Sequence, residues 1–201
     1  MQIGEVKPMA NFETPLALLS DCHRRVEKFL GVIQAVAVEG RGHELNVEYR
    51  AGLDTALRYF QHAAPLHTQD EEASLFPRLR ASGAPEVEAA MARLDGLEAD
   101  HRAAEPLHAE IDVLGRKWLA EGTLPPEETG RLVEAITRLR SMYASHIALE
   151  DSTVFPLAGR VLDLESLLSV GREMADRRSI PAVVPQGFSR CADRRSTSPG
   201  I

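Results

Sequence analysis

The fold is decided by two similar stretches of sequence, HTQDEEASLFP at residues 67–77 and HIALEDSTVFP at residues 146–156. Each stretch begins with a histidine, carries a glutamate four residues later and closes on Phe-Pro. The apolar residues before the two stretches align at the same offset: Leu53 with Leu132, Leu57 with Ile136, Phe60 with Leu139, and Ala64 with Tyr143. Self-similarity of this kind predicts a supersecondary unit that occurs twice in the chain.

A weaker similarity links the residues around His23 to those around His101, since HRRVE at 23–27 resembles HRAAE at 101–105. Each half of the chain is therefore interpreted as one helical hairpin. Its first helix carries a histidine, and its second helix carries the His-x-x-x-Glu motif. Two such hairpins are expected to pack into a four-helix bundle with pseudo-twofold symmetry.

Apolar residues recur at spacings of three and four through most of the chain, as is typical of amphipathic helices in a bundle. The first long helix is expected to begin at Pro15, with Thr14 as its N-cap, and to end at Gly40. The third is expected to stop near Gly122, and the proline pair at 125–126 opens the fourth. Short connections imply antiparallel neighbours. The predicted fold class is all-α, an up-down antiparallel four-helix bundle.

The 201 residues are predicted to form one domain, residues 1–178, whose short extra C-terminal helix covers about residues 164–178. Residues 179–201 are predicted to be a disordered tail. They are rich in proline, serine and charge, so they bury too little apolar surface to offset the entropy lost on ordering.

Composition excludes several classes of protein. A formal net charge of -7 argues against nucleic acid or an anionic membrane as a partner. The first residues contain no apolar stretch long enough for a signal peptide, and the sequence has no run of about 18 apolar residues. We therefore expect a cytoplasmic protein without a membrane span. Cys22 and Cys191 suggest neither a disulfide scaffold nor a thiolate zinc site.

The chemistry of the chain lies on the apolar stripes of its expected helices. Residues four apart on a helix share one face, about 5–6 Å from each other, so each His-x-x-x-Glu motif can reach a common ion. Six polar residues fall on the core stripes: His23, His67, Glu71, His101, His146 and Glu150. An uncompensated buried carboxylate costs several kcal/mol. These residues therefore predict a buried cation, and imidazole with carboxylate and no thiolate suits iron, manganese or zinc.

The remaining histidines have simpler interpretations. His43 lies in a glycine-flanked loop and is expected to be solvated, and His62 is expected at the surface or beside a ligand. His108 is about 10 Å along the helix from His101, too far to share an ion. It forms a Glu-x-x-His pair with Glu105, but a ferritin-like site needs two such pairs, and only one is present.

Three further residues bear on the site. Glu27 and Glu105 each have three open interpretations, as a metal ligand, as an acceptor that orients a histidine or as a surface charge. For Glu27 the orienting role is favoured. Pro65 lies inside the second helix, where it should produce a kink that aims His67 and Glu71 inwards.

The arrangement of His23, His67-x-x-x-Glu71, His101 and His146-x-x-x-Glu150, with Phe-Pro closing both motifs, resembles the hemerythrin-like, or HHE cation-binding, family. The resemblance covers about residues 14 to 178. It implies a non-haem di-iron centre. The implied metal ligands are His23, His67, Glu71, His101, His146 and Glu150, with Glu71 and Glu150 as bridges.

One departure from the oxygen carriers of that family concerns position 105. Those proteins have a fifth histidine four residues after the third-helix histidine, where this chain has Glu105. The set of four histidines and two glutamates is more similar to that of bacterial iron-centre repair proteins and of other bacterial hemerythrin-like proteins. The cysteine-bearing N-terminal segment of the repair proteins is not found in these 201 residues, so we do not expect their role to carry over.

Three functions follow as hypotheses. The first is a di-iron protein that binds or senses dioxygen, nitric oxide or iron. The second is a di-iron enzyme that detoxifies peroxide or nitric oxide, or that repairs iron centres. The third is a structural bundle whose polar core only satisfies itself. The expected partner is a small diatomic ligand or peroxide, and the oligomeric state stays open.

Overall fold

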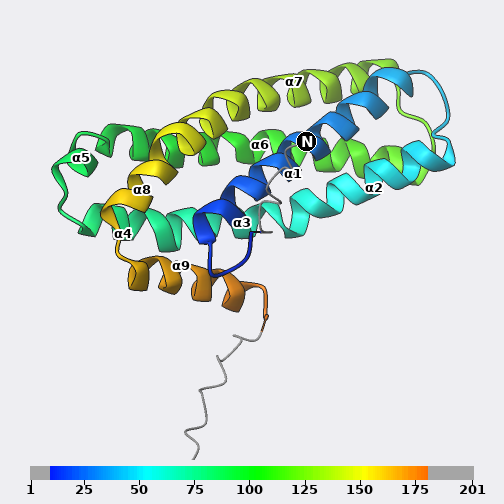
Figure 1. Ribbon diagram of the computed structural model, residues 1–201. Coiled ribbons are helices and arrows are strands. Elements are labelled where there is room, and N and C mark those ends of the chain that lie inside the picture. Colours follow the sequence, from blue (N-terminus) through cyan, green and yellow to red (C-terminus); the bar gives the residue numbers. More distant parts are fainter. Residues whose placement is uncertain (1–9, 181–201) are drawn as a thin grey trace, which may run out of the picture.

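The computed structural model describes residues 10–180. Within them every regular element is helical, and no strand is present, which confirms the all-α prediction (Figure 1). The elements in chain order are α1 (Pro15–Glu39), α2 (Val47–His62), α3 (Ala64–Asp70), the π-helical turn η1 (Glu71–Leu75), α4 (Phe76–Ala81), α5 (Pro85–Glu88), α6 (Met91–Glu121), α7 (Pro126–Leu149), the π-helical turn η2 (Glu150–Val154), α8 (Phe155–Val161) and α9 (Leu164–Arg177).

Two helical hairpins make the bundle. In the first hairpin, α1 packs on α2 and α3, and in the second, α6 packs on α7. Contacts of α1 with α7 and of α2 with α6 join the hairpins side by side (Figure 1). Each long helix therefore has two neighbours, as the up-down topology predicts.

The ends of the long helices follow the sequence signals. Pro15 opens α1, where its missing N–H is of no consequence. Gly40 caps the end of α1, and Gly122 ends α6 with a φ of 79°, a left-handed conformation that favours glycine. Thr14 precedes α1 but its hydroxyl makes no capping bond. It accepts a hydrogen bond from the Asn11 N–H at 3.0 Å instead.

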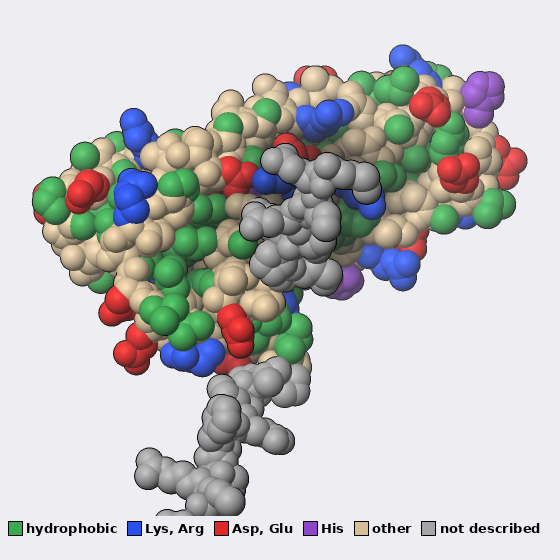
Figure 2. Space-filling model, viewed as in Figure 1, with side chains coloured by type: hydrophobic (Ala, Val, Ile, Leu, Met, Phe, Trp, Pro, Cys, Tyr) green, Lys and Arg blue, Asp and Glu red, His purple; other side chains and the backbone are tan. Residues whose placement is uncertain are grey.

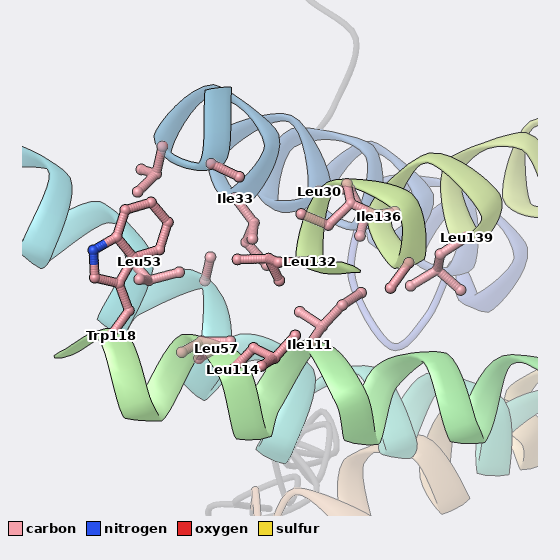
Figure 3. Packing of buried hydrophobic residues seen from close by; sticks show 14 of the residues in the cluster. Leu30, Ile33, Leu53, Leu57, Ile111, Leu114, Trp118, Leu132, Ile136 and Leu139 are labelled. Atoms are coloured by element: carbon pink, nitrogen blue, oxygen red, sulfur yellow. The ribbon is translucent and has the colours of Figure 1, made fainter. Parts of the chain in front are cut away.

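Two apolar cores fill the bundle. One lies towards the end that holds the α1–α2 and α6–α7 connections, where Trp118 packs beside Leu53 and Ile33 (Figure 3). The other lies among α4, α8, α9 and the facing parts of α1 and α6, and it includes Phe76 and Phe155. On α1, on the run of α2 and α3, and on α6, the histidines and glutamates of the predicted site come between the residues of one core and those of the other. On α7, His146 and Glu150 lie on either side of Ile147, the last residue of the first core. The polar residues thus form a layer inside the molecule.

The predicted extra C-terminal helix is present as α9, which lies against α1 and α3 (Figure 1). It is held by the fully buried carboxylate of Asp70, which accepts hydrogen bonds from Arg177 at 2.9 Å and from Arg178 at 2.6 Å. It also packs closely on the segment before α1, because a Cβ on Gly171 would lie 1.8 Å from the Phe12 carbonyl oxygen. The predicted disordered tail falls almost wholly outside the described residues.

Acidic and basic side chains are interspersed on the face shown in Figure 2. Among the described residues, no helix has the length and apolar character needed to cross a membrane.

Candidate metal centre

The second helix of the first hairpin is interrupted where the sequence predicts a kink. α2 ends at His62 and α3 begins at Ala64, so Pro65 stands in the first turn of α3, a position where proline is tolerated. The helix that carries His67 therefore starts afresh beside the polar layer. The kink is present, and its role in aiming His67 and Glu71 stays a prediction.

A π-helical turn begins at each of the two motif glutamates. The N–H of Phe76 bonds to the carbonyl of Glu71, and that of Phe155 to the carbonyl of Glu150, five residues earlier rather than four. The proline that follows each phenylalanine has no N–H, and its ring clashes with the carbonyl four residues earlier, which favours a wider turn at this place. Such turns are rare and concentrate at functional sites. Sequence reasoning missed them, although the Phe-Pro repeat marks where they lie.

The six residues that the sequence singles out come together in two clusters. One consists of His23, His67, Glu71 and Glu150, and the other of Glu71, His101, His146 and Glu150; within each cluster the candidate ligand atoms lie within 4.8 Å of one another. Both glutamates belong to both clusters, and the two histidines of each cluster come from one hairpin. The pseudo-twofold symmetry of the sequence is therefore also a symmetry of the site.

The Nε2 atoms of the histidines point at the two carboxylates. His23 Nε2 lies 3.1 Å from a Glu150 oxygen and 3.8 Å from a Glu71 oxygen. His67 Nε2 lies 3.3 Å from Glu71. In the second cluster, His146 Nε2 lies 3.2 Å from Glu150 and His101 Nε2 lies 3.5 Å from Glu71.

The donor set fits divalent metal ions. Glu71 and Glu150 are fully buried, and imidazole nitrogens lie 3.1–3.3 Å from their oxygens, but none of these contacts among the described residues has hydrogen-bond geometry. The buried His23 Nε2 likewise makes no hydrogen bond there. Two converging buried carboxylates repel each other and cost several kcal/mol each. Ions shared between them and the surrounding imidazoles would supply the missing partners.

Protonation in the metal-free site reflects this crowding. Burial and the neighbouring Glu150 raise the pKa of Glu71 well above its ordinary value. Burial would lower the pKa of His23, but contacts with Glu150 and Glu71 raise it to about 10. Burial, followed by the repulsion of His23, lowers the pKa of His67 to about 3. The raised pKa values favour a proton on Glu71 and on His23, which offsets the negative charge of the two carboxylates in the absence of a cation.

Carboxylates outside the two clusters hold the Nδ1 atoms of three histidines. Glu72 lies 2.8 Å from His101 Nδ1, and Asp151 lies 3.1 Å from His23 Nδ1. Each contact crosses from one hairpin to the other, because Glu72 follows Glu71 in the first hairpin and Asp151 follows Glu150 in the second. Such partners fix the ring and its tautomer. The alignment of Glu72 with Asp151 in the repeat was the signal that sequence reasoning left unused.

The third of these contacts joins Asp100 of α6 to His146 Nδ1 at 3.3 Å. The Nδ1 of His67 is buried and has no hydrogen-bond partner in residues 10–180. The set of orienting contacts is therefore incomplete on the first hairpin.

The glutamates left open by the sequence lie outside the site. Glu27 and Glu105 are both exposed, and neither belongs to the metal-ligand clusters. The prediction that Glu27 orients a histidine is wrong: the chain uses Asp151, Glu72 and Asp100 for that purpose. The prediction rested on the spacing of Glu27, four residues after His23 on the same helix. It did not consider the neighbouring hairpin, whose Asp151 supplies the closer carboxylate.

The other histidines have the places expected of them. His43 and His62 are exposed. His108 is half-buried, its pKa lowered to about 4 by burial, and its Nε2 shares a hydrogen bond of 2.8 Å with the Tyr143 hydroxyl. This pair stands beside the polar layer and contributes to neither cluster.

Two cavities adjoin the histidines. The inner one has a volume of about 20 Å³ and is lined by residues that include His23, His67 and His146. The outer one, of about 420 Å³, lies between α3 and α6. Tyr143 and His101 line both cavities, so they form part of the wall between them.

Comparison with known proteins agrees with this geometry. An uncharacterized protein of Haemophilus influenzae is 29% identical to the chain over 180 residues, which cover 90% of this chain and 99% of that protein. Residues 14–158, which contain both His-x-x-x-Glu motifs and both hairpins, match the hemerythrin HHE cation binding domain. The chain therefore belongs to the hemerythrin HHE cation-binding domain family.

Proposed function

We propose that the protein is a non-haem di-iron protein that binds or senses dioxygen, nitric oxide or iron. The two ions would be held by the residues of the two clusters: His23, His67, Glu71, His101, His146 and Glu150. The observation that carries this proposal is the pair of fully buried carboxylates of Glu71 and Glu150, which converge from the two hairpins and accept no hydrogen bond from the described residues. Carboxylates shared by both clusters suit two ions side by side.

The size of the inner cavity supports a small ligand. A cavity needs roughly 10–15 Å³ to hold one water molecule. The inner cavity has about 20 Å³ and is lined by the four histidines that would hold the ions, so the space left beside bound ions would admit only a small molecule. Bound iron supplies one-electron redox chemistry and open coordination positions. The chain's own residues restrict access, because Val26, Ala64 and Ile147 line the inner cavity together with the histidines and keep it small.

The first test of this function is the metal content of protein purified without oxygen, followed by its absorption spectrum on admission of air. We expect about two irons per chain and a new charge-transfer band. The double variant Glu71→Gln, Glu150→Gln should lose the iron, because neutral amides replace both shared carboxylates. Glu105→Gln is the matched control, since Glu105 is exposed beside the outer cavity. Protein that holds no iron, or a single zinc, would refute the di-iron function.

The same double variant addresses the structural alternative. A polar core that merely satisfies itself should leave metal-free and metal-loaded protein equally stable. We expect the melting temperature of the native sequence to rise on iron loading, because a ligand that binds only the folded state stabilises it. The rise should be absent in the double variant.

A second candidate function, an enzyme acting on peroxide or nitric oxide, is favoured by the outer cavity. Its volume of about 420 Å³ and its lining by Tyr143 and His108 provide a polar approach to the histidine layer. Turnover assays with peroxide and with nitric oxide distinguish the candidates. A rate no higher than that of free iron would leave binding as the function.

A further inference from the structure

The two halves of the candidate metal centre differ in how their histidines are held. In the second cluster both histidines have a carboxylate on Nδ1, Glu72 for His101 and Asp100 for His146. In the first cluster Asp151 holds His23, but His67 Nδ1 has no hydrogen-bond partner in the part of the chain that the structure describes. The inequivalence is therefore confined to one ring.

The internal repeat explains which residue is missing. Asp100 directly precedes His101, and the residue in the equivalent place before His23 is Cys22. The Cys22 side chain is only 7% exposed. Cys22 lies on α1, which packs against α3, the helix of His67. A thiol replaces the carboxylate at this position, and thiols are weak hydrogen-bonding groups.

An acceptor on the outer ring nitrogen has a known effect on metal binding. An acceptor on Nδ1 fixes the tautomer, holds the ring in the orientation that a metal ligand needs and makes Nε2, the nitrogen that faces the metal, more basic. Loss of such a partner costs about 10–100-fold in metal affinity. His67 would have to supply its Nε2 without this help, whereas His146, its counterpart in the repeat, has the Asp100 carboxylate.

We infer that the two metal ions are held unequally, with an exchangeable ion on His23 and His67 and a retained ion on His101 and His146. The expected difference in affinity is about 10–100-fold. The protein would then pass through a half-loaded state, in which the second cluster is filled and the first is free to take up or release iron. This inference rests on the proposed di-iron function and deepens its iron-binding part.

The test is the rate at which a chelator removes ferrous iron from the full chain without oxygen, followed by the colour of the iron–chelator complex. We expect two phases of equal amplitude whose rates differ about 10–100-fold. Asp100→Ala, which removes the acceptor on His146 Nδ1, should accelerate the slow phase and leave the fast one unchanged. Asp21→Ala is the matched control, because Asp21 is an exposed aspartate on α1 and should change neither phase.

The converse variant is Cys22→Asn, which returns an oxygen acceptor to the position equivalent to Asp100. The fast phase should slow, and the slow phase should stay as it is. If Cys22→Asn does not fold, Asp100→Ala alone decides the matter, because Asp100 is 43% exposed and tolerates substitution. Two ions that leave at one rate would overturn this inference alone. Binding of fewer than two ions under saturating iron would overturn the di-iron function as well.

Discussion

The attachment of α9 to α3, the helix that carries His67, yields a prediction whose size follows from the structure. Asp70 is fully buried, and its carboxylate accepts hydrogen bonds from Arg177 and Arg178, which are 19% and 20% exposed. Removing one partner of a buried ion pair costs about 3–5 kcal/mol. Since both guanidinium groups retain some contact with water, we expect Asp70→Asn to lower the free energy of unfolding by about 3 kcal/mol, the lower end of that range.

The assay is urea unfolding of the metal-free protein followed by circular dichroism, with the melting temperature as a second readout. A loss of about 3 kcal/mol corresponds to a fall of roughly 6–12 °C for a chain of this length. Asp176→Asn serves as control, because Asp176 is an exposed aspartate on α9. We expect that variant to stay within about 0.5 kcal/mol of the native sequence.

A double-mutant cycle separates the ion pair from other effects. Arg178→Gln removes the guanidinium group that bonds to both Asp70 oxygens, at 3.2 Å and 2.6 Å. If the pair holds α9 in place, the two substitutions together should cost less than their sum by at least about 1 kcal/mol. A coupling energy of zero, or an Asp70→Asn protein as stable as the Asp176→Asn control, would refute this account of how α9 docks.

Three further predictions concern the fold and the kink. Gly171→Ala places a Cβ 1.8 Å from the Phe12 carbonyl oxygen and should cost about 1–3 kcal/mol in thermal unfolding, whereas Gly130→Ala, in open space on α7, should not destabilise. Burial lowers the pKa of His108 from 6.5 to about 4, so its unfolded form binds a proton that the folded form excludes. The free energy of unfolding should therefore be unaffected by this group above pH 6.5 and fall by up to about 3 kcal/mol as the pH drops to 4. His108→Gln should remove that part of the pH dependence of urea unfolding. Pro65→Ala should lower the iron content per chain, measured by metal analysis, and unchanged content would show that the kink does not aim the ligands.

Much of the fold was readable from local patterns. Apolar spacing located the long helices, and Pro15, Gly40 and Gly122 marked three of their ends. These signals are local, since a proline or glycine acts on the backbone of its own turn whatever packs against it. The repeated His-x-x-x-Glu motifs likewise carried their own geometry, because residues four apart on a helix share a face.

The same local reasoning missed the π-helical turns at Glu71 and Glu150. It assumed a constant 3.6 residues per turn, and each wider turn changes the direction of every side chain after it. Glu72 and Asp151, which directly follow those glutamates, therefore point at histidines of the opposite hairpin.

The sequence by itself determined that six histidines and glutamates lie on buried helical stripes, since periodicity states which face of a helix is apolar. Only the tertiary structure decided which carboxylate meets which ring. Glu27 shares a helix with His23 yet points to solvent, while Asp151, 128 residues away, bonds to that histidine. The pairing of the buried Asp70 with Arg177, the last residue of α9, and with Arg178, the next residue, was equally invisible in the sequence. Such contacts depend on the rotation and spacing of neighbouring helices, which are set by the packing of the whole core rather than by any one stretch of chain.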